Sequence, residues 1–255
     1  MAGFDFSGRK VLVTGASRGI GRAVALAFAR AGAQVAVHFH RQADQARETL
    51  AAMPGTGHIM VQANIADPAA VEQMVAQVVD RLGRIDVLVN NAGIYYYHPL
   101  DECSYQEWQS AWQEILGTNL IGAANVTYCV ARHMMSRRSG RIINVSSRGA
   151  FRGEPRATAY GASKAGLNAF SQSLAQHLAP YNIYVMVVAP GFVETDMARD
   201  ILDGPEGEAI RRQSPLNRVA RPEEVAHAVL FLASEGAEFT TGTIVDVNGA
   251  SYLRS

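Results

Sequence analysis

Residues 10–21 read KVLVTGASRGIG, and this stretch decides the fold. Lys10–Thr14 is an apolar, β-branched run typical of a buried strand. Glycines follow at positions 15, 19 and 21, and apolar side chains then recur at helical spacing, at Ile20, Val24, Ala27, Phe28 and Ala31. Glycines let the backbone approach a pyrophosphate, and the N–H groups of a helix N-terminus face it. The stretch therefore predicts a dinucleotide-binding turn, with contacts from Gly15, Ser17, Arg18, Gly19, Ile20 and Gly21.

Two other interpretations of this turn stay open. It is compatible with an ordinary tight connection between a strand and a helix. Gly15-Ala-Ser-Arg-Gly19 also fits the G-x-S-x-G nucleophile elbow of a serine hydrolase, with Ser17 as nucleophile. That elbow needs an oxyanion loop from an earlier strand, and only 14 residues precede Gly15, so the dinucleotide turn is preferred.

Outward from this unit, strand-like and helical segments alternate along the whole chain. The Pro68–Leu82 segment is a clear helix, because it carries one apolar stripe and begins after Asp67, a favourable N-cap. The other strand-like runs are 34–38, 58–62, 85–90, 141–146, 183–189 and 243–247. Most are continuously apolar, as in parallel sheets covered on both faces. The pattern predicts an α/β fold, a doubly wound, Rossmann-type parallel sheet of about seven strands.

We expect one domain over residues 1–255, because no linker, repeat or low-complexity tract divides the chain; the acidic segment 203–208 is expected to be a mobile loop. The chain has 23 basic and 23 acidic residues and no basic cluster, which argues against nucleic-acid and membrane-surface partners. It shows no membrane-helix or signal-peptide segment, which predicts a cytoplasmic protein. Cys103 and Cys129 are expected in helices as buried free thiols, and no histidine cluster of zinc type is present, so no metal is expected.

The end of the second predicted strand bears on the choice of cofactor. An acidic residue there favours NAD, whereas basic residues favour the 2′-phosphate of NADP. The sequence is His38-Phe39-His40-Arg41, without a carboxylate before Asp44. Arg18 adds a second cation within reach, although Arg41 alone could equally be a solvated surface residue. NADP is therefore preferred over NAD, with Phe39, His40 and Arg41 near the adenosine ribose.

A phenol and an ammonium lie four residues apart, at Tyr160 and Lys164, on one face of a helix predicted from about Thr158 to Ala179. We expect the ammonium to lower the pKa of the phenol and make it usable for proton transfer. The strand 141–146 ends in Ser146-Ser147 at the sheet edge where such folds bind ligands. Ser147 is preferred for holding a substrate carbonyl, because strand alternation turns Ser146 the other way.

Together these residues resemble the short-chain dehydrogenase/reductase superfamily from Val11 to about Tyr252. Further motifs carry the resemblance: Asn90-Asn-Ala-Gly93, Gly117-Thr-Asn-Leu120 and Ala189-Pro-Gly-Phe-Val-Glu-Thr-Asp196. The resemblance implies a catalytic tetrad of Asn119, Ser147, Tyr160 and Lys164. It implies that Tyr160 protonates a carbonyl as hydride arrives from the nicotinamide. It further implies that Lys164 binds the nicotinamide ribose and passes protons through a water held at Asn119; bonding to backbone is an equal alternative for Asn119.

The same resemblance implies further dinucleotide contacts, at Asn64, Ile65, Asn91, Ala92, Gly93, Tyr160, Lys164, Pro190, Gly191, Val193 and Thr195. Two positions depart from the family pattern. Asn64 stands where relatives often have aspartate, and Ala250 follows Gly249 where a second glycine is usual. Relatives are commonly tetramers built from the helix carrying the tyrosine and from the C-terminal region, so a homotetramer is expected.

Substrate loops are expected at 94–98, 148–156 and 192–216. Three tyrosines and the charged residues Arg148, Arg152, Glu154 and Arg156 would suit a polar substrate, although at least two of these arginines are expected to be solvated at the rim. The segments 191–197 and 215–226 look most like the 3-oxoacyl-(acyl carrier protein) reductase branch. The expected function is an NADP(H)-dependent oxidoreductase interconverting a ketone and a secondary alcohol, with a 3-oxoacyl thioester as substrate. The alternatives are a sugar, sugar-acid or other polar secondary-alcohol dehydrogenase, a non-catalytic cofactor-binding regulator, and a serine hydrolase.

Overall fold

The computed structural model describes residues 3–254, and within them one parallel sheet of seven strands organises the fold. The strand order is β3-β2-β1-β4-β5-β6-β7, and every neighbouring pair is parallel. The strands are β1 (Lys10–Val13), β2 (Gln34–Phe39), β3 (Ile59–Gln62), β4 (Val87–Asn90), β5 (Gly140–Val145), β6 (Ile183–Pro190) and β7 (Ile244–Val247). The order reverses between β1 and β4, and such folds bind ligands at the carboxyl ends of the strands on either side of this point.

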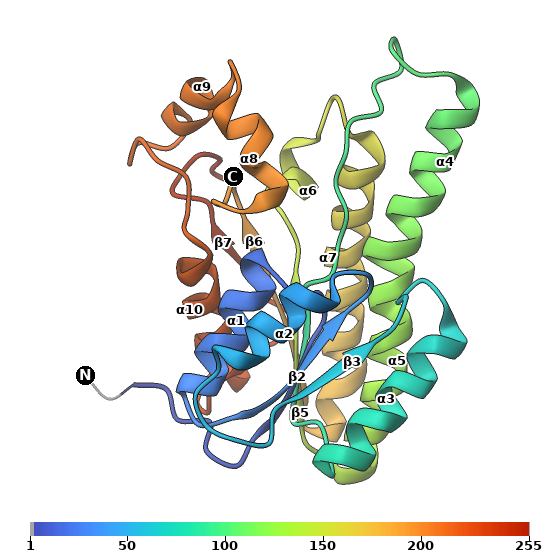
Figure 1. Cartoon of the computed structure of the whole chain (residues 1–255), viewed down its shortest axis with the longest axis vertical. Coiled ribbons are helices and arrows are strands. Elements are labelled where there is room, and N and C mark those ends of the chain that lie inside the picture. Colours follow the sequence, from blue (N-terminus) through green and yellow to red (C-terminus); the bar gives the residue numbers. More distant parts are fainter. Residues whose placement is uncertain (1–2, 255) are drawn as a thin grey trace.

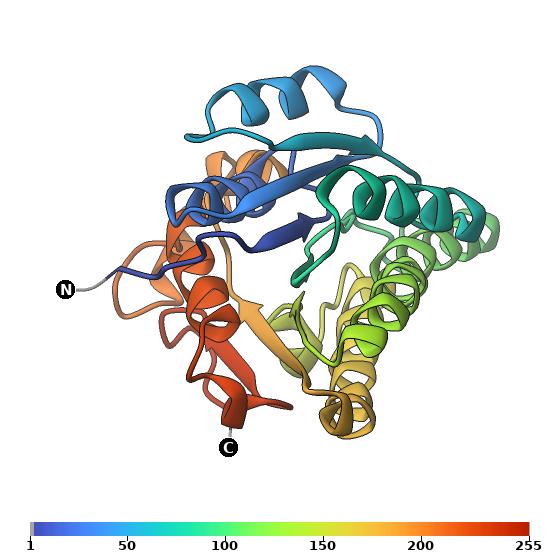
Figure 2. The ribbon, with the colours of Figure 1, turned by 90° about the horizontal axis from the view of Figure 1, so that it is seen from below.

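Helices cover both faces of the sheet (Figures 1 and 2). The bounds are α1 (Gly19–Arg30), α2 (Ala43–Ala51), α3 (Pro68–Leu82), α4 (Tyr105–Leu116), α5 (Ala123–Arg137), α6 (Gly149–Arg152), α7 (Thr158–Leu178), α8 (Asp196–Asp203), α9 (Gly207–Arg212) and α10 (Pro222–Ala233). One apolar core lies under α1 and α10, and a second lies under α3, α5 and α7. This arrangement confirms the predicted doubly wound sheet.

Local sequence explains where several elements begin and end. The Asp67 carboxylate accepts from the Ala69 and Ala70 N–H groups at the start of α3, and Gly83, at φ 81°, ends the helix in the left-handed conformation. The inner strands β1 and β4 are buried on both faces, as their continuous runs of apolar residues predict. A π-helical turn, Gly117–Gly122, joins α4 to α5 and was not foreseen.

Two local predictions were wrong. Segment 203–208 is not one mobile loop, because Asp203 ends α8 and Gly207 begins α9, which leaves only three residues between the helices. Cys103 lies in a turn before α4 rather than in a helix, whereas Cys129 lies in α5; both are free and half-buried. No helix between residues 3 and 254 has the length and apolar character needed to cross a membrane.

Candidate active site

The glycine turn between β1 and α1 forms a cradle that side chains would fill. Gly15 and Gly19 have φ of 62° and 55°, which favour glycine. A Cβ on Gly15 would lie 2.8 Å from the Ala92 Cα, and a Cβ on Gly21 would lie 2.2 Å from the Gly15 carbonyl oxygen. The backbone is thus bare where a pyrophosphate would approach, and the residues present fit a dinucleotide.

The loop after β4 holds this turn in place. The Asn91 side-chain amide donates to the carbonyl oxygens of Thr14 and Gly15, both at 3.0 Å. The Thr14 hydroxyl accepts from the Asn91 and Ala92 N–H groups at 3.0 and 3.1 Å. Asn91 and Ala92 therefore lie at the turn, as predicted, and their hydrogen bonds stiffen it. Gly93 continues toward the catalytic residues, since a Cβ there would lie 3.6 Å from Lys164 Nζ.

His38 supports the turn from β2, a role that the sequence did not reveal. Its Nδ1 accepts from the Gly15 N–H at 3.0 Å, and its Nε2 is 3.1 Å from the Ala63 carbonyl oxygen. Burial lowers the pKa of His38 to about 4, so the neutral ring accepts at Nδ1 and donates at Nε2. Ser17 is also buried, and within residues 3–254 it makes no hydrogen bond to a histidine side chain. The nucleophile-elbow interpretation therefore finds no support.

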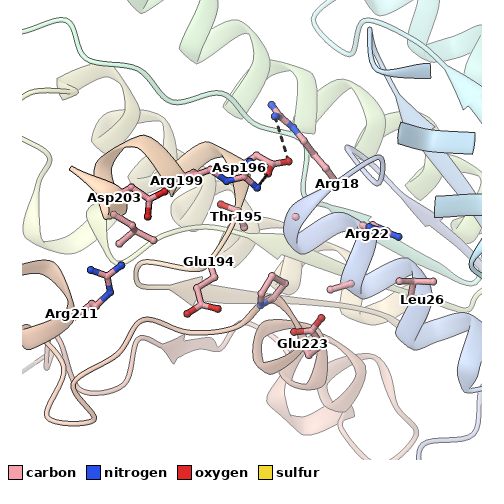
Figure 3. Close-up of a pocket in the computed structure, with 14 residues that line it drawn as sticks. Arg18, Arg22, Leu26, Glu194, Thr195, Asp196, Arg199, Asp203, Arg211 and Glu223 are labelled. Carbon is pink, nitrogen blue, oxygen red and sulfur yellow. Dashed lines mark hydrogen bonds and ion pairs between the residues drawn. The ribbon is translucent and has the colours of Figure 1, made fainter. Parts of the chain in front are cut away.

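The cations predicted for a 2′-phosphate lie at the open edge of the turn. Arg18 is half-exposed, and its Nη1 is 3.9 Å from the Asp196 carboxylate (Figure 3). The pair crosses a mixed-charge cavity of about 680 Å³ between α1 and α8, which Gly19 and Thr195 also line. Arg41 is exposed and forms no ion pair in the described part of the chain. Phe39 is buried and His40 is exposed, and the residues from Phe39 to Ala43 include no carboxylate.

Of the two residues predicted near the adenine after β3, one is exposed and the other is buried. Asn64 is exposed, and its Oδ1 accepts from the Ala66 N–H at 3.2 Å. Ile65 is buried, and its carbonyl oxygen accepts from the Asn125 side chain at 3.2 Å. Asn64 therefore has an accessible amide at the end of β3, whereas Ile65 contributes through packing and backbone.

Ser147, Tyr160 and Lys164 meet at the carboxyl end of β5. The Ser147 hydroxyl accepts from the Gly149 N–H at 3.0 Å and lies close enough to the Tyr160 phenol to lower its pKa. Lys164 Nζ lies 5.7 Å from the centroid of the Tyr160 ring and donates to the Val145 carbonyl oxygen at 2.8 Å. Ser146 faces away from the phenol and donates to the Lys164 carbonyl oxygen at 3.3 Å. The geometry thus agrees with the choice of Ser147 over Ser146.

The pKa of Tyr160 is raised rather than lowered, so that expectation was wrong. Burial raises the pKa of Tyr160 to about 12; the nearby Ser147 hydroxyl opposes this increase, and the Glu154 carboxylate adds to it. Burial lowers the pKa of Lys164 to about 8. The ammonium sits over the ring at a distance and bonds a backbone carbonyl, so it does not offset the desolvation of the phenol.

Asn119 joins the substrate side to the catalytic helix from within the π-helical turn. Its Oδ1 accepts from the Ile94 N–H at 2.8 Å, and its Nδ2 donates to the Ile94 carbonyl oxygen at 3.0 Å and to Ser163 Oγ at 3.2 Å. Both expected roles involve a polar side chain fixed near Lys164. The bonds to the Ile94 N–H and carbonyl oxygen correspond to the alternative role of Asn119, in which its side chain bonds backbone groups.

The residues predicted for the nicotinamide follow β6. The Gly191 N–H donates to the Val247 carbonyl oxygen at 3.1 Å, and Pro190 accepts from the Arg148 N–H at 2.9 Å. Val193 is buried, and a Cβ on Gly19 would lie 3.2 Å from the Thr195 methyl group. This segment therefore reaches the glycine turn at Gly19.

Residues of the expected substrate loops 94–98 and 148–156 lie near Tyr160. The Tyr95 ring packs edge-on against the Tyr160 ring, with centroids 4.8 Å apart. Arg152 and Arg156 are exposed, as expected for rim residues. Arg148 is only 3% exposed; it donates to Ser251 Oγ at 2.6 Å and to Gln213 Oε1 at 2.5 Å. Its burial was not predictable from a charged, loop-like segment.

Comparisons with known proteins agree with this geometry. The family described as Enoyl-(Acyl carrier protein) reductase matches residues 15–250. The 3-oxoacyl-(acyl-carrier-protein) reductase FabG of Escherichia coli is 40% identical over 98% of this chain and 99% of its own, and that of Staphylococcus aureus is 39% identical over 96% and 98%. A short-chain dehydrogenase from Burkholderia cenocepacia, solved in complex with NADP, superposes with a TM-score of 0.86 at 33% identity, over 96% of this chain and 98% of its own.

A dehydrogenase/reductase from Sinorhizobium meliloti superposes with a TM-score of 0.89 at 32% identity, over 98% of each chain. The chain belongs to the short-chain dehydrogenase/reductase superfamily. Within that superfamily, its sequence places it in the branch of the 3-oxoacyl-(acyl-carrier-protein) reductases.

Proposed function

We propose that this chain is an NADPH-dependent ketoreductase that reduces a 3-oxoacyl thioester to the 3-hydroxyacyl thioester. The observation that carries the proposal is the proximity of Ser147, Tyr160 and Lys164 beside a glycine cradle, with Lys164 one helical turn from Tyr160. The names of the curated relatives support the substrate class, and the neighbour solved with NADP supports the cofactor.

The residues divide the chemistry between them. Ser147 holds the substrate carbonyl, and Tyr160, protonated at neutral pH because burial raises its pKa to about 12, donates a proton to the carbonyl oxygen. NADPH, when bound, supplies the hydride that the carbonyl carbon accepts. Lys164 provides a buried positive charge that stabilises the negative charge left on Tyr160. Asn119 fixes the loop after β4 through its hydrogen bond with the Ile94 N–H.

The same residues fit the dinucleotide along its length. The cradle of Gly15, Gly19 and Gly21 would take the pyrophosphate at the start of α1. Arg18 and Arg41 would bind the 2′-phosphate, because no carboxylate stands at the end of β2 to repel it. The predicted contacts at 64–65, 91–93 and 190–195 remain proposals for the adenine, ribose and nicotinamide ends.

Replacing Tyr160 by Phe tests the mechanism. Y160F keeps the ring and loses the proton donor, so we expect turnover of a 3-oxoacyl thioester to fall by at least about 10²-fold. NADPH binding, followed by fluorescence titration, is expected to persist. Y181F is the matched control, since Tyr181 precedes the amino end of β6, at the opposite end of that strand from Pro190, and this variant should keep its turnover. Retained activity in Y160F would remove the proposal.

A polar secondary alcohol is the second candidate substrate, and Glu154 favours it. The carboxylate is close enough to Tyr95 and Tyr160 to affect both pKa values, and burial raises its own pKa. It could accept hydrogen bonds from substrate hydroxyl groups. A panel of 3-oxoacyl thioesters, sugars and sugar acids, each assayed with NADPH or NADP and with NADH or NAD, separates the two candidates. A cofactor-binding regulator would bind NADPH and turn over none of them.

We also propose that the chain acts in the cytoplasm as a single-domain subunit of a homotetramer. Two separate groups of exposed apolar residues support the assembly. Tyr105 and Tyr128 lie on α4 and α5, with 71% and 69% exposed, and Phe239 and Leu253 lie beside β7. Exposed apolar groups at two separate places on one subunit suit the paired two-fold axes of a tetramer with dihedral symmetry. Light scattering coupled to gel filtration measures the mass, and a monomer would contradict this assignment.

A further inference from the structure

His98 is a buried imidazole between the substrate loop and the catalytic helix. Its side chain is 3% exposed. Its backbone N–H donates to the Arg156 carbonyl oxygen at 2.8 Å. Its Nδ1 is 3.1 Å from the Tyr96 carbonyl oxygen, and its Nε2 is 3.1 Å from the Ala159 nitrogen. The ring therefore connects the loop after β4 with the first turn of α7.

These partners define the tautomer of His98. A carbonyl oxygen only accepts, so Nδ1 must carry the hydrogen that bonds Tyr96. A backbone N–H only donates, so Nε2 must be the acceptor for Ala159. The bond to Tyr96 thus needs a hydrogen on Nδ1, and the bond to Ala159 needs a free lone pair on Nε2.

The start of α7 needs this acceptor. The first four N–H groups of a helix have no partner within the helix, and a side chain at the N-cap usually accepts from one of them. The N-cap of α7 is Ala157, whose side chain has no acceptor. Ala159 is fully buried, so water does not replace the missing group. His98, from 61 residues earlier in the chain, accepts from the residue directly before Tyr160.

The substrate loop and the helix start also touch through aromatic rings. The Tyr95 ring meets the Tyr160 ring edge-on, at an interplanar angle of 85°. The Arg156 guanidinium lies 4.7 Å from the Tyr97 ring centroid and pairs with Glu102 at 3.1 Å. His98 belongs to the same loop and bonds Arg156 through its own backbone N–H. The orientation of Tyr160 thus depends on a loop that His98 ties to the helix.

We propose that His98 is a positioning residue for Tyr160. Its neutral Nε2 completes the N-terminus of α7, and its Nδ1 holds the loop that packs Tyr95 on the catalytic ring. This inference rests on the proposed reductase function, because it assigns His98 an effect on proton donation by Tyr160. No part of the ring needs to touch substrate or cofactor.

Two polar variants separate the hydrogen bonds of the ring. H98Q can place an amide oxygen where Nε2 lies and so keep the acceptor for Ala159. H98N is shorter, so it can keep the bond to Tyr96 and lose the bond to Ala159. We expect H98N to lower kcat by at least about tenfold, because small displacements of a catalytic group are costly. We expect H98Q to stay within about threefold of the wild type, with the Kd for NADPH unchanged in both.

Hydrogen exchange gives a readout that does not need turnover. In the wild type and in H98Q, the Ala159 amide should exchange slowly, and in H98N it should exchange quickly while the rest of α7 stays protected. A wild-type Ala159 amide that exchanges quickly would overturn the proposal even if H98N failed to fold. Full kcat in H98N, or equal losses in both variants, would also overturn it. Absence of thioester reduction by the wild type would refute the function alone, since the exchange comparison still tests His98.

Discussion

Replacing Gly21 by Ala should weaken dinucleotide binding without unfolding the chain. The added Cβ would lie 2.2 Å from the Gly15 carbonyl oxygen and 2.5 Å from the Asn91 side-chain nitrogen. A carbon and an oxygen in contact normally stay at least about 3.3 Å apart, so the turn must move by about 1 Å. Overpacking of this kind costs about 1–3 kcal/mol. The displaced oxygen accepts one of the two hydrogen bonds by which Asn91 holds the turn.

The loss should appear mainly in binding, because the moved backbone is the proposed pyrophosphate cradle. A cost of about 1–3 kcal/mol corresponds to roughly a fivefold to 150-fold increase in the Kd for NADPH, measured by fluorescence titration. Gly117→Ala is the matched control: a Cβ there would lie 4.0 Å from the Ala66 methyl group, an ordinary contact. A folded G21A that binds NADPH within twofold of the wild type would refute the cradle.

Two further predictions concern charge. Burial alone would raise the pKa of Asp86, but hydrogen bonds from the Lys10 N–H, Arg137 and Arg84 outweigh burial and lower this pKa from its usual value of 3.8. The ionised carboxylate therefore stabilises the folded state above pH 3.8. This stabilisation is lost as the pH falls and the carboxylate takes up a proton. Asp86→Asn should therefore cost about 1–3 kcal/mol in urea unfolding at neutral pH, and an equal deficit at low pH would contradict this reasoning. Arg41→Ala should raise the Kd for NADPH by about tenfold and leave that for NADH unchanged, because only NADPH carries the 2′-phosphate; equal effects on both cofactors would argue against this role.

The sheet, its helices and the proximity of Ser147, Tyr160 and Lys164 followed from the sequence, because they depend on local patterns. Continuous apolar runs indicate strands buried on both faces, and an i, i+4 spacing places two side chains on one helix face. Contacts between distant segments did not follow. His38 and His98 show no role in the sequence, and each acquires its role from a backbone N–H that only the fold brings near.

Electrostatics was the least predictable feature, because it depends on burial. The spacing of Tyr160 and Lys164 indicated that a cation is near, but it did not show how strongly both groups are desolvated. Arg148 gives the same lesson: burial lowers its pKa to about 10, and its hydrogen-bond partners come from Gln213 and Ser251, far along the chain. From sequence alone, a charged residue in a loop is predicted to be solvated, because the distant segments that cover it are known only from the fold.

The raised pKa of Tyr160 also bears on the direction of reaction. Ketone reduction begins from the protonated phenol, and alcohol oxidation begins from the phenolate. With a pKa of about 12, the phenolate is rare at neutral pH, and its fraction rises about tenfold with each pH unit. The initial rate of oxidation should therefore rise steeply between about pH 6 and pH 8 while the rate of reduction stays level. Above pH 8, Lys164 loses its proton, since burial lowers its pKa to about 8, and reduction should then decline. Equal pH profiles in both directions would show that Tyr160 does not carry the proton.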